Sequence, residues 1–299
     1  MAANLKEVRD RIKSVINTQQ ITKAMKMVSA AKLRKAQQAI VQLRPYADKQ
    51  NEMLKNILSN LGGDVDISFG KVREVKSVCI VVVTSSRGLC GAFNTNVIKA
   101  AIASIEGKYA AQRAEGNLTI VPIGKKGFDF FRKRYPSIPM NRDYVDLFND
   151  LSFVNVSKAS DYLMDSFTDG KFDVVEVAYG KFKNAATQFT ITEQFLPVVN
   201  APSEDESSPK NRADYIFEPD MESLLEYLVP SILKTTFQKY VLDTHASEHG
   251  ARMTAMDKAS ENANELLKDL KLSYNKARQE AITNEILEIV GGAAALEGG

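Results

Sequence analysis

The sequence predicts an α/β protein: a long antiparallel coiled coil of the N- and C-terminal helices, joined to a central Rossmann-like domain with a mostly parallel sheet. Two observations predict this fold. Helix-breaking residues gather in the middle of the 299-residue chain, since residues 1–44 hold neither Pro nor Gly and residues 231–299 hold no Pro. Strand-like apolar runs lie in the same middle part. Each end of the chain is therefore expected to be a long helix.

The N-terminal helix is expected over residues 1–61, because its apolar residues recur at steps of three and four. They are Leu5, Val8, Ile12 and Val15 and, after a shift of the repeat near residues 19–33, Leu33, Ala36, Ile40, Leu43 and Ala47. So narrow an apolar stripe is typical of a helix that pairs with one other helix.

The C-terminal helix is expected over residues 213–290, with residues 291–299 as a flexible tail. Its stripe is Met253, Met256, Ala259, Ala263, Leu266, Leu270, Tyr274 and Ala277. Pro230 is expected to begin or bend this helix. Gly250 inside it costs about 0.5–1 kcal/mol relative to Ala, so Gly250→Ala is expected to be neutral or mildly stabilising. A domain joins the end of the first helix to the start of the second, so the pair must be antiparallel.

The central domain is expected over residues 72–200. Three apolar, β-branched runs predict buried parallel strands, and an alternating run predicts an edge strand. These runs are Ser77–Val83, Leu118–Ile123, Asp173–Tyr179 and, at the edge, Thr187–Leu196. Helical stretches lie between them, near Thr95–Glu106, Lys125–Arg134 and Ser157–Thr168. Residues 201–212 are expected to form an exposed loop.

Composition excludes several classes of protein. The net charge is +2, and no run approaches the roughly 18 apolar residues of a membrane span. The N-terminus has no apolar segment of the secretory type, and two cysteines fit a reducing compartment. From Arg11 to Ala47 there are eight cations and no acid. This stretch is either a solvated helix face or a surface for an anionic partner: phosphate, nucleic acid, lipid or an acidic protein loop.

One pattern could carry metal chemistry. His245, Glu248 and His249 match H-x-x-E-H, a zinc-protease pattern that places both imidazoles on one helical face. A slender helix offers no cleft around such a site, and three fixed letters match easily by chance. A structural role for both histidines is the favoured interpretation.

Other motifs are weaker. The loop Ser85–Gly91 follows a strand, but neither it nor Gly124–Gly127 matches a known phosphate-binding pattern, so both are interpreted as structural turns. Cys90 has no His nearby in sequence that would favour a catalytic thiol. The basic first helix could bind nucleic acid, yet Tyr46 is the only aromatic residue in the first 50. The sequence therefore indicates no catalytic residue, cofactor or metal, and a basic coiled-coil nucleic-acid-binding protein remains the alternative.

Six sequence blocks resemble the gamma subunit of F-type ATP synthases. They are Ile21–Val28, Arg87–Gly91, Tyr215–Asp220, Ala246–Met256, Tyr274–Thr283 and Glu288–Ala293. They are ordered along the whole chain, whereas residues 100–212 carry little of the resemblance.

This resemblance implies a non-catalytic central stalk. Its coiled coil would turn inside a ring of three alpha and three beta subunits. Its α/β domain would contact the epsilon subunit and the membrane c-ring. Rotation driven by protons would pass through it to the catalytic ring. The chain would be peripheral, on the cytoplasmic face of the bacterial inner membrane, with membrane contact only through the c-ring and no nucleic-acid partner.

The resemblance also assigns roles to individual residues. Met25 matches a position that faces an acidic loop of beta, and Arg87 and Lys99 match cations that touch beta. Arg278, Gln279 and Thr283 match a polar catch with beta. Tyr215 and Glu218 match the foot at the c-ring and epsilon, and Ile286, Ile289 and Val290 match an apolar bearing. Cys79 and Cys90 lie in or next to the first strand, and the redox insert of plant-type gamma subunits is not seen, so thiol regulation is not expected.

Overall fold

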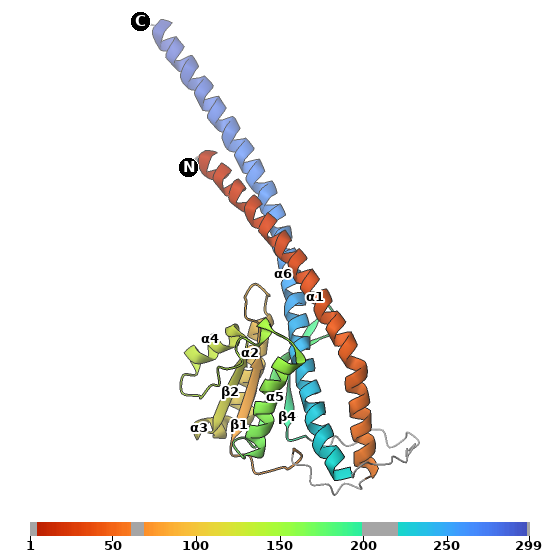
Figure 1. Ribbon diagram of the computed structural model, residues 1–299. Coiled ribbons are helices and arrows are strands. Elements are labelled where there is room, and N and C mark those ends of the chain that lie inside the picture. Colours follow the sequence, from red (N-terminus) through yellow and green to blue (C-terminus); the bar gives the residue numbers. More distant parts are fainter. Residues whose placement is uncertain (1–4, 61–68, 199–220, 298–299) are drawn as a thin grey trace. The chain divides into compact units, whose positions relative to one another are not determined.

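The computed structural model describes residues 5–60, 69–198 and 221–297 (Figure 1). The chain divides into two compact units. Residues 1–29 with 253–299 form the first, called here the helix-pair unit, and residues 30–252 form the second, the sheet unit. The predicted combination of long terminal helices and a central, mostly parallel sheet is confirmed.

Two long helices, α1 (Leu5–Asn60) and α6 (Met221–Glu297), contribute to both units. Pro230 neither begins nor ends α6, which starts nine residues before it. The helix also continues past the predicted boundary at residue 290, through two glycines. The expected loop 201–212 and residues 213–220 lie outside the described residues. Within the described residues, no helix is both long and apolar enough to span a membrane.

The helix-pair unit keeps a regular heptad where the sequence predicted a shift. On α1 the inward-facing positions continue from Leu5 through Gln19, Thr22, Lys26 and Ser29 at steps of three and four, and Thr22 and Ser29 are buried. The prediction of a shift was wrong because polar side chains occupy these heptad positions, so the apolar pattern alone loses the repeat.

From Met256 on, the seam of α6 also differs from the predicted one, at two positions. Leu267 is buried and Leu266 is 41% exposed, the reverse of the prediction. Ser260 is likewise buried in place of the predicted Ala259, and with both changes the α6 seam steps regularly by four and three. It comprises Met256, Ser260, Ala263, Leu267, Leu270, Tyr274 and Ala277. A strict heptad is the repeat that two supercoiled helices require.

Side-chain contacts across this unit fix the direction of the two helices. Residue numbers rise along α1 as those of their partners fall along α6, which confirms the antiparallel pairing. The pairs are Arg9 with Tyr274 (2.9 Å), Gln19 with Asn264, Thr22 with Ser260 (2.7 Å) and Lys26 with Asp257.

The described residues of the sheet unit form a four-stranded sheet in the order β2-β1-β3-β4. The strands β1 (Val78–Val83), β2 (Leu118–Ile123) and β3 (Val174–Phe182) are parallel, and β4 (Gln188–Leu196) pairs antiparallel with β3 at the edge. All four lie where the sequence predicted them. The parallel strands form because their β-branched residues are buried on both faces of the sheet.

Helices cover both faces of this sheet (Figure 1). Alternate β1 residues face α5 (Phe153–Thr168) and the first part of α6 on one side. On the other side they face α2 (Phe93–Ala103) and Phe131 of α4 (Lys125–Arg134). Short turns complete the unit: a π-helix (Ser104–Lys108), α3 (Ala110–Ala114) and a 3₁₀ turn (Leu147–Asn149).

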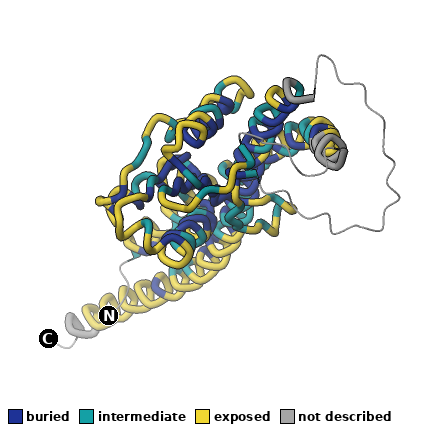
Figure 2. The backbone as a smooth tube through the Cα atoms, turned by 90° about the horizontal axis from the view of Figure 1, so that it is seen from below, coloured by how far each residue is buried: buried dark blue, intermediate teal, exposed yellow. Residues whose placement is uncertain are grey.

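The first part of α6 is core rather than coiled coil. Most of its apolar side chains from Leu225 to Val241 are buried against the sheet and α5, whereas Tyr227 is exposed. Figure 2 shows the same helix changing from mostly buried to exposed along its length. The sequence showed a narrow apolar stripe on this helix only from Met253 onward. The first part shows no single stripe because a helix buried on more than one side has apolar residues around most of its circumference.

The hairpin between β3 and β4 packs against α6 at Gly250. A Cβ atom placed on this glycine would lie 3.2 Å from Gln188 Nε2 and 3.3 Å from the carbonyl oxygen of Ala185. Gln188 Nε2 also donates to that carbonyl (2.8 Å), so the hairpin is held in this position. The glycine therefore has a packing reason that the sequence did not indicate.

We expect Gly250→Ala to change the free energy of unfolding by less than about 0.5 kcal/mol, because the gain in helix propensity is offset by displacement of the hairpin. Gly250→Leu should lose about 1–3 kcal/mol through overpacking. Denaturant unfolding of the two variants measures both effects. If the free energy of unfolding of Gly250→Ala rose by about 1 kcal/mol, the full gain in helix propensity, the hairpin would have moved at no measurable cost.

Candidate functional site

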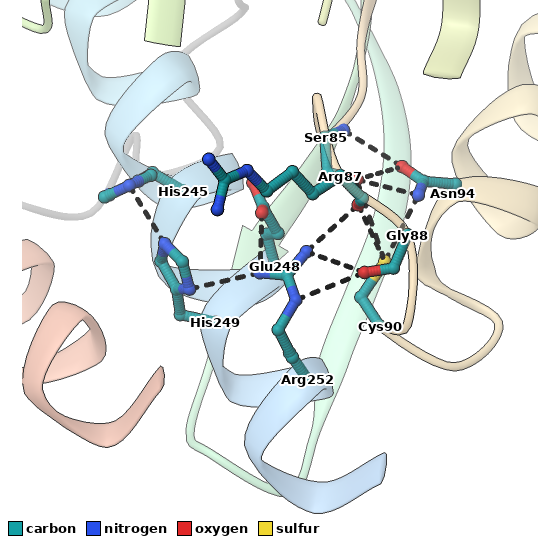
Figure 3. A network of polar contacts seen from close by, with 9 residues as sticks. All are labelled: Ser85, Arg87, Gly88, Cys90, Asn94, His245, Glu248, His249 and Arg252. Atoms are coloured by element: carbon teal, nitrogen blue, oxygen red, sulfur yellow. Dashed lines mark hydrogen bonds and ion pairs between the residues drawn. The ribbon is translucent and has the colours of Figure 1, made fainter. Parts of the chain in front are cut away.

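The turn that follows β1 is held by its own polar groups (Figure 3). The backbone N–H of Ser85 donates to Asn94 Oδ1 (2.9 Å), and its hydroxyl donates to the carbonyl of Arg87 (2.6 Å). Asn94 Nδ2 donates to the sulfur of Cys90 (3.2 Å). Leu89 has a φ of 63° and is 64% exposed. A non-glycine residue in this conformation is strained by about 1–3 kcal/mol, and such strain gathers at functional sites.

Arg252 of α6 clamps this turn from the other side. Its guanidinium donates to the carbonyls of Arg87 (3.0 Å) and Gly88 (3.1 Å) and forms an ion pair with Glu248 (2.7 Å). Both charged side chains are 8% exposed. Burial raises the pKa of Glu248, whereas the charge of Arg252 acts in the opposite direction. Two sequence blocks that lie far apart in the chain thus form one network.

The two histidines belong to the same network. Their Nε2 atoms lie 3.1 Å apart, and His249 Nδ1 lies 3.2 Å from Arg252 Nη1. Burial, with nearby cations, lowers the pKa of His245 to about 4 and that of His249 to about 3, so both rings are neutral at pH 7. Across the described ranges, no group of three His, Cys, Asp or Glu side chains is arranged to hold a metal.

The residues assigned to beta-subunit contacts divide between the two units. Arg87 and Lys99 are exposed in the sheet unit, on the β1 turn and on α2. Met25 is half-buried on α1 in the helix-pair unit. Arg278 and Gln279 are exposed on α6. Thr283 is exposed too, one turn further on, and its hydroxyl donates to the carbonyl of Gln279 (2.9 Å).

The end of α6 exposes a run of large apolar side chains. Ile286 is 55%, Ile289 66% and Val290 60% exposed. Leu287 is 63% exposed as well, and the sequence had not singled it out. Every residue from 278 to 293 is exposed, so no described part of the chain covers this segment. Tyr215 and Glu218, assigned to the foot, lie outside the described residues.

Sequence reasoning did not find the clamp. Arg252 and Glu248 lie in a block that the sequence pointed out, but nothing in their spacing connects them to the β1 turn. The signal that could have indicated them is the i,i+4 spacing of opposite charges on a helix otherwise buried at that level.

The fold of this chain is also found in solved structures. It is similar to a chain in a structure of the Euglena gracilis mitochondrial ATP synthase (OSCP/F1/c-ring, rotational state 3), with a TM-score of 0.63, 21% identity and coverage of 99% of this chain and 95% of that one. It is also similar to a chain in the central stalk/c-ring structure of the Tetrahymena thermophila enzyme (TM-score 0.54, 22% identity, 80% and 99% coverage). At 21–22% identity these similarities show a shared fold.

The sequence comparisons identify the family. The family model described as ATP synthase matches residues 4–296. The ATP synthase gamma chain of Cytophaga hutchinsonii is 54% identical over 98% of this chain and 99% of its own length. That of Flavobacterium psychrophilum is 54% identical over 99% and 100%. The chain belongs to the family of ATP synthase gamma chains, which are non-catalytic subunits. Nothing in these comparisons supports the nucleic-acid-binding alternative.

We expect Arg252→Met to lower the free energy of unfolding by about 3–5 kcal/mol, because it leaves the Glu248 carboxylate buried without its partner. Adding Glu248→Gln to this variant should recover part of the loss. Denaturant unfolding of both single variants and the double variant gives the coupling energy between the two side chains. If the loss of stability in the double variant equalled the sum of the losses in the two single variants, the two side chains would not be coupled.

We expect the two histidines to make the chain less stable in acid. Their folded pKa values lie below the ordinary value of 6.5, so the unfolded chain binds more protons below that pH. Stability is therefore full above about pH 6.5. It falls toward pH 3–4 by up to about 1.4 kcal/mol per pH unit for each proton taken up.

The pair His245→Gln with His249→Gln isolates this effect, because glutamine does not titrate. Burial raises the pKa of Asp243 to about 6, which acts in the opposite direction, but that carboxyl is present in both proteins. Unfolding midpoints at pH 7 and pH 4.5 should differ less in the double variant than in the unchanged chain. An equal difference would mean that other groups cause the acid loss.

Proposed function

We propose that this chain is the central rotor subunit of a proton-driven F-type ATP synthase. It transmits rotation between the membrane c-ring and a ring of three alpha and three beta subunits. The proposal is supported by the 54% identity between this chain and two ATP synthase gamma chains over nearly its whole length. The observation that carries it within the structure is the uncovered end of α6, since a run of exposed isoleucine and valine side chains requires an apolar partner.

Ile286, Ile289 and Val290 would form the apolar bearing at this end. An apolar contact suits a rotating part because it is non-directional and has no fixed hydrogen-bond partners to break. Several solvent-exposed polar contacts would then transmit torque. Each is worth about 0–1 kcal/mol, so no single one stops the rotation.

The coupling contacts with beta would come from both units. Met25, Arg278, Gln279 and Thr283 would contribute from the helix-pair unit. Arg87, with Lys99, would contribute from the sheet unit. The Arg252 clamp supports this assignment, because it fixes the backbone from which Arg87 extends.

The membrane-side contacts stay a prediction from the resemblance. Tyr215 and Glu218 would contact the c-ring and epsilon. The chain would act on the cytoplasmic face of the bacterial inner membrane, as a peripheral subunit that touches the membrane only through the c-ring.

We expect Arg278→Ala with Gln279→Ala to reduce coupled ATP synthesis at least several-fold in the assembled enzyme, because torque transfer at the catch is lost. The isolated chain should fold normally, since both side chains are exposed. Lys271→Ala with Ser273→Ala is a matched control, because it also removes one cation and one polar group from exposed positions of α6.

ATP synthesis in membrane vesicles measures coupling, and native mass spectrometry of the tagged complex measures assembly. Full synthesis by the Arg278/Gln279 variant would reject the catch assignment. If the unchanged chain did not co-purify with three alpha and three beta subunits, the rotor proposal itself would fail.

A further inference from the structure

Three cations gather where the first two strands of the sheet end. β1 and β2 are parallel neighbours, so the turns that follow them, residues 84–91 and 124–127, lie at the same edge of the sheet. Arg87 belongs to the first turn, and Lys125 and Lys126 begin α4 in the second. All three side chains are exposed, and none of them forms an ion pair with a described residue.

The two turns are held together by backbone contacts. The N–H of Lys126 donates to the carbonyl of Ser85 (3.1 Å). Gly124 has a φ of 92°, and a Cβ atom placed on it would clash with the carbonyl of Thr84. Only glycine allows so close an approach in this conformation. The two turns therefore form one fixed surface, which Arg252 fastens to α6.

Lys126 also lies against the turn that carries Arg87. A Cβ atom placed on Gly88 would be 3.6 Å from Lys126 Cε and 3.9 Å from its Nζ, so the ammonium group lies beside this turn. The Arg87 side chain extends from the same turn toward α6 (Figure 3). The turn therefore has one cation on its α4 side and another on its α6 side.

The two lysines are unfavourable for α4 itself. They occupy its first turn, which contains no acidic residue and follows a glycine that provides no side-chain cap. Positive side chains at the N-terminus of a helix oppose its macrodipole, whereas negative ones stabilise it. Residues that cost stability without a gain inside the fold are expected at functional sites. Lys125 and Lys126 thus point to a contact with another molecule.

The first turn also presents an apolar side chain. Leu89 is exposed, and its φ of 63° is one that leucine rarely adopts. The hydrogen bonds of Ser85 hold the turn in this conformation. An exposed aliphatic side chain on a fixed backbone, with charges around it, is typical of a protein interface. Phosphate surfaces would use the cations alone, so Leu89 favours a protein partner over nucleic acid or lipid.

We propose that Leu89, Lys125 and Lys126 complete, together with Arg87, a docking surface for an acidic loop of a beta subunit. Carboxylates of the loop pair with the cations, and one of its apolar side chains packs on Leu89. Exposed ion pairs attract only weakly, which suits a contact that is released in each turn of a rotor. The inference rests on the proposed function, which assigns Arg87 to beta, and it adds residues that the family resemblance did not assign.

Carbodiimide cross-linking of the purified complex tests this contact directly. The reagent joins a lysine amine to a touching carboxylate as an amide, with loss of water. We expect mass spectrometry to find Lys125 or Lys126 joined to an aspartate or glutamate of beta. Lys158, exposed on α5, is the control and should form no such link. If the two lysines formed no link, or linked only to another subunit, the proposal would be wrong.

Charge reversal measures what the contact contributes. Lys125→Glu with Lys126→Glu should lower ATP synthesis in membrane vesicles at least about fivefold, because attraction to the loop becomes repulsion. The isolated chain should be no less stable, since acidic residues suit the start of α4. Lys158→Glu with Lys171→Glu makes the same charge change at other exposed positions of the sheet unit and should lower synthesis less than about twofold. A folded charge variant that fails to assemble, beside a control that assembles, also supports the contact.

Leu89→Asn distinguishes docking from folding. Asparagine adopts a positive φ more readily than leucine, so the free energy of unfolding should stay the same or rise. ATP synthesis should nevertheless fall at least about threefold, because the apolar anchor is lost. Equal losses of stability and synthesis would instead assign Leu89 to the folding of the turn.

The outcomes also distinguish this inference from the rotor proposal. If the unchanged chain forms the complex and the charge and leucine variants synthesise ATP at the same rate, the docking surface is wrong and the rotor assignment stands. If the unchanged chain does not co-purify with alpha and beta subunits, the rotor proposal fails and this inference fails with it.

Discussion

The heptad seam of α1 is the constraint on which the other parts of the structure depend. The same period of three and four continues from Leu5 through the polar residues of the helix-pair unit to Ile40 and Gln50 in the sheet unit. Between Gln19 and Ser29 the seam has no large apolar residue, so the two helices gain little from apolar burial along this stretch. Hydrogen bonds and one ion pair replace the missing apolar contacts in the polar stretch. The pairing is therefore specific rather than strong.

The second helix serves three environments in turn, and its composition changes accordingly. From Leu225 to Val241 it is part of the sheet core. Around Glu248 and Arg252 it binds the turn after β1 through buried charges. From Arg278 to Ala293 every residue is exposed, although isoleucine, leucine and valine recur there. The physical conflict between apolar composition and exposure at this end is what makes a surrounding partner necessary.

The sequence was sufficient for the strands and for the direction of the helix pair. Continuous runs rich in β-branched residues, such as Val78–Val83, indicated strands because their short length and composition suit a strand buried on both faces. Heptad positions taken by Thr22 and Ser29 could not be recognised, since a hydroxyl gives no apolar signal. The Arg252 clamp was hidden for another reason: it joins groups 164 and 165 residues apart. The proposed partners of the exposed residues would belong to other chains, so the fold of this chain alone does not show those contacts.

The matched polar pairs of the helix-pair unit also determine the axial position of one helix along the other. Small apolar residues alone would tolerate a slide by one heptad, because alanine packs almost equally well in the next register. A slide of seven residues would bring Thr22 opposite Leu267 in place of Ser260 and leave its buried hydroxyl without the partner that it has now. The hydroxyl would keep its bond to the carbonyl of Gln19 on the same helix, so the slide loses the cross-helix bond, worth about 0.5–1.5 kcal/mol. Two helices locked in this way can twist together without slipping lengthwise, so a rotation applied at one end arrives at the other with its phase preserved.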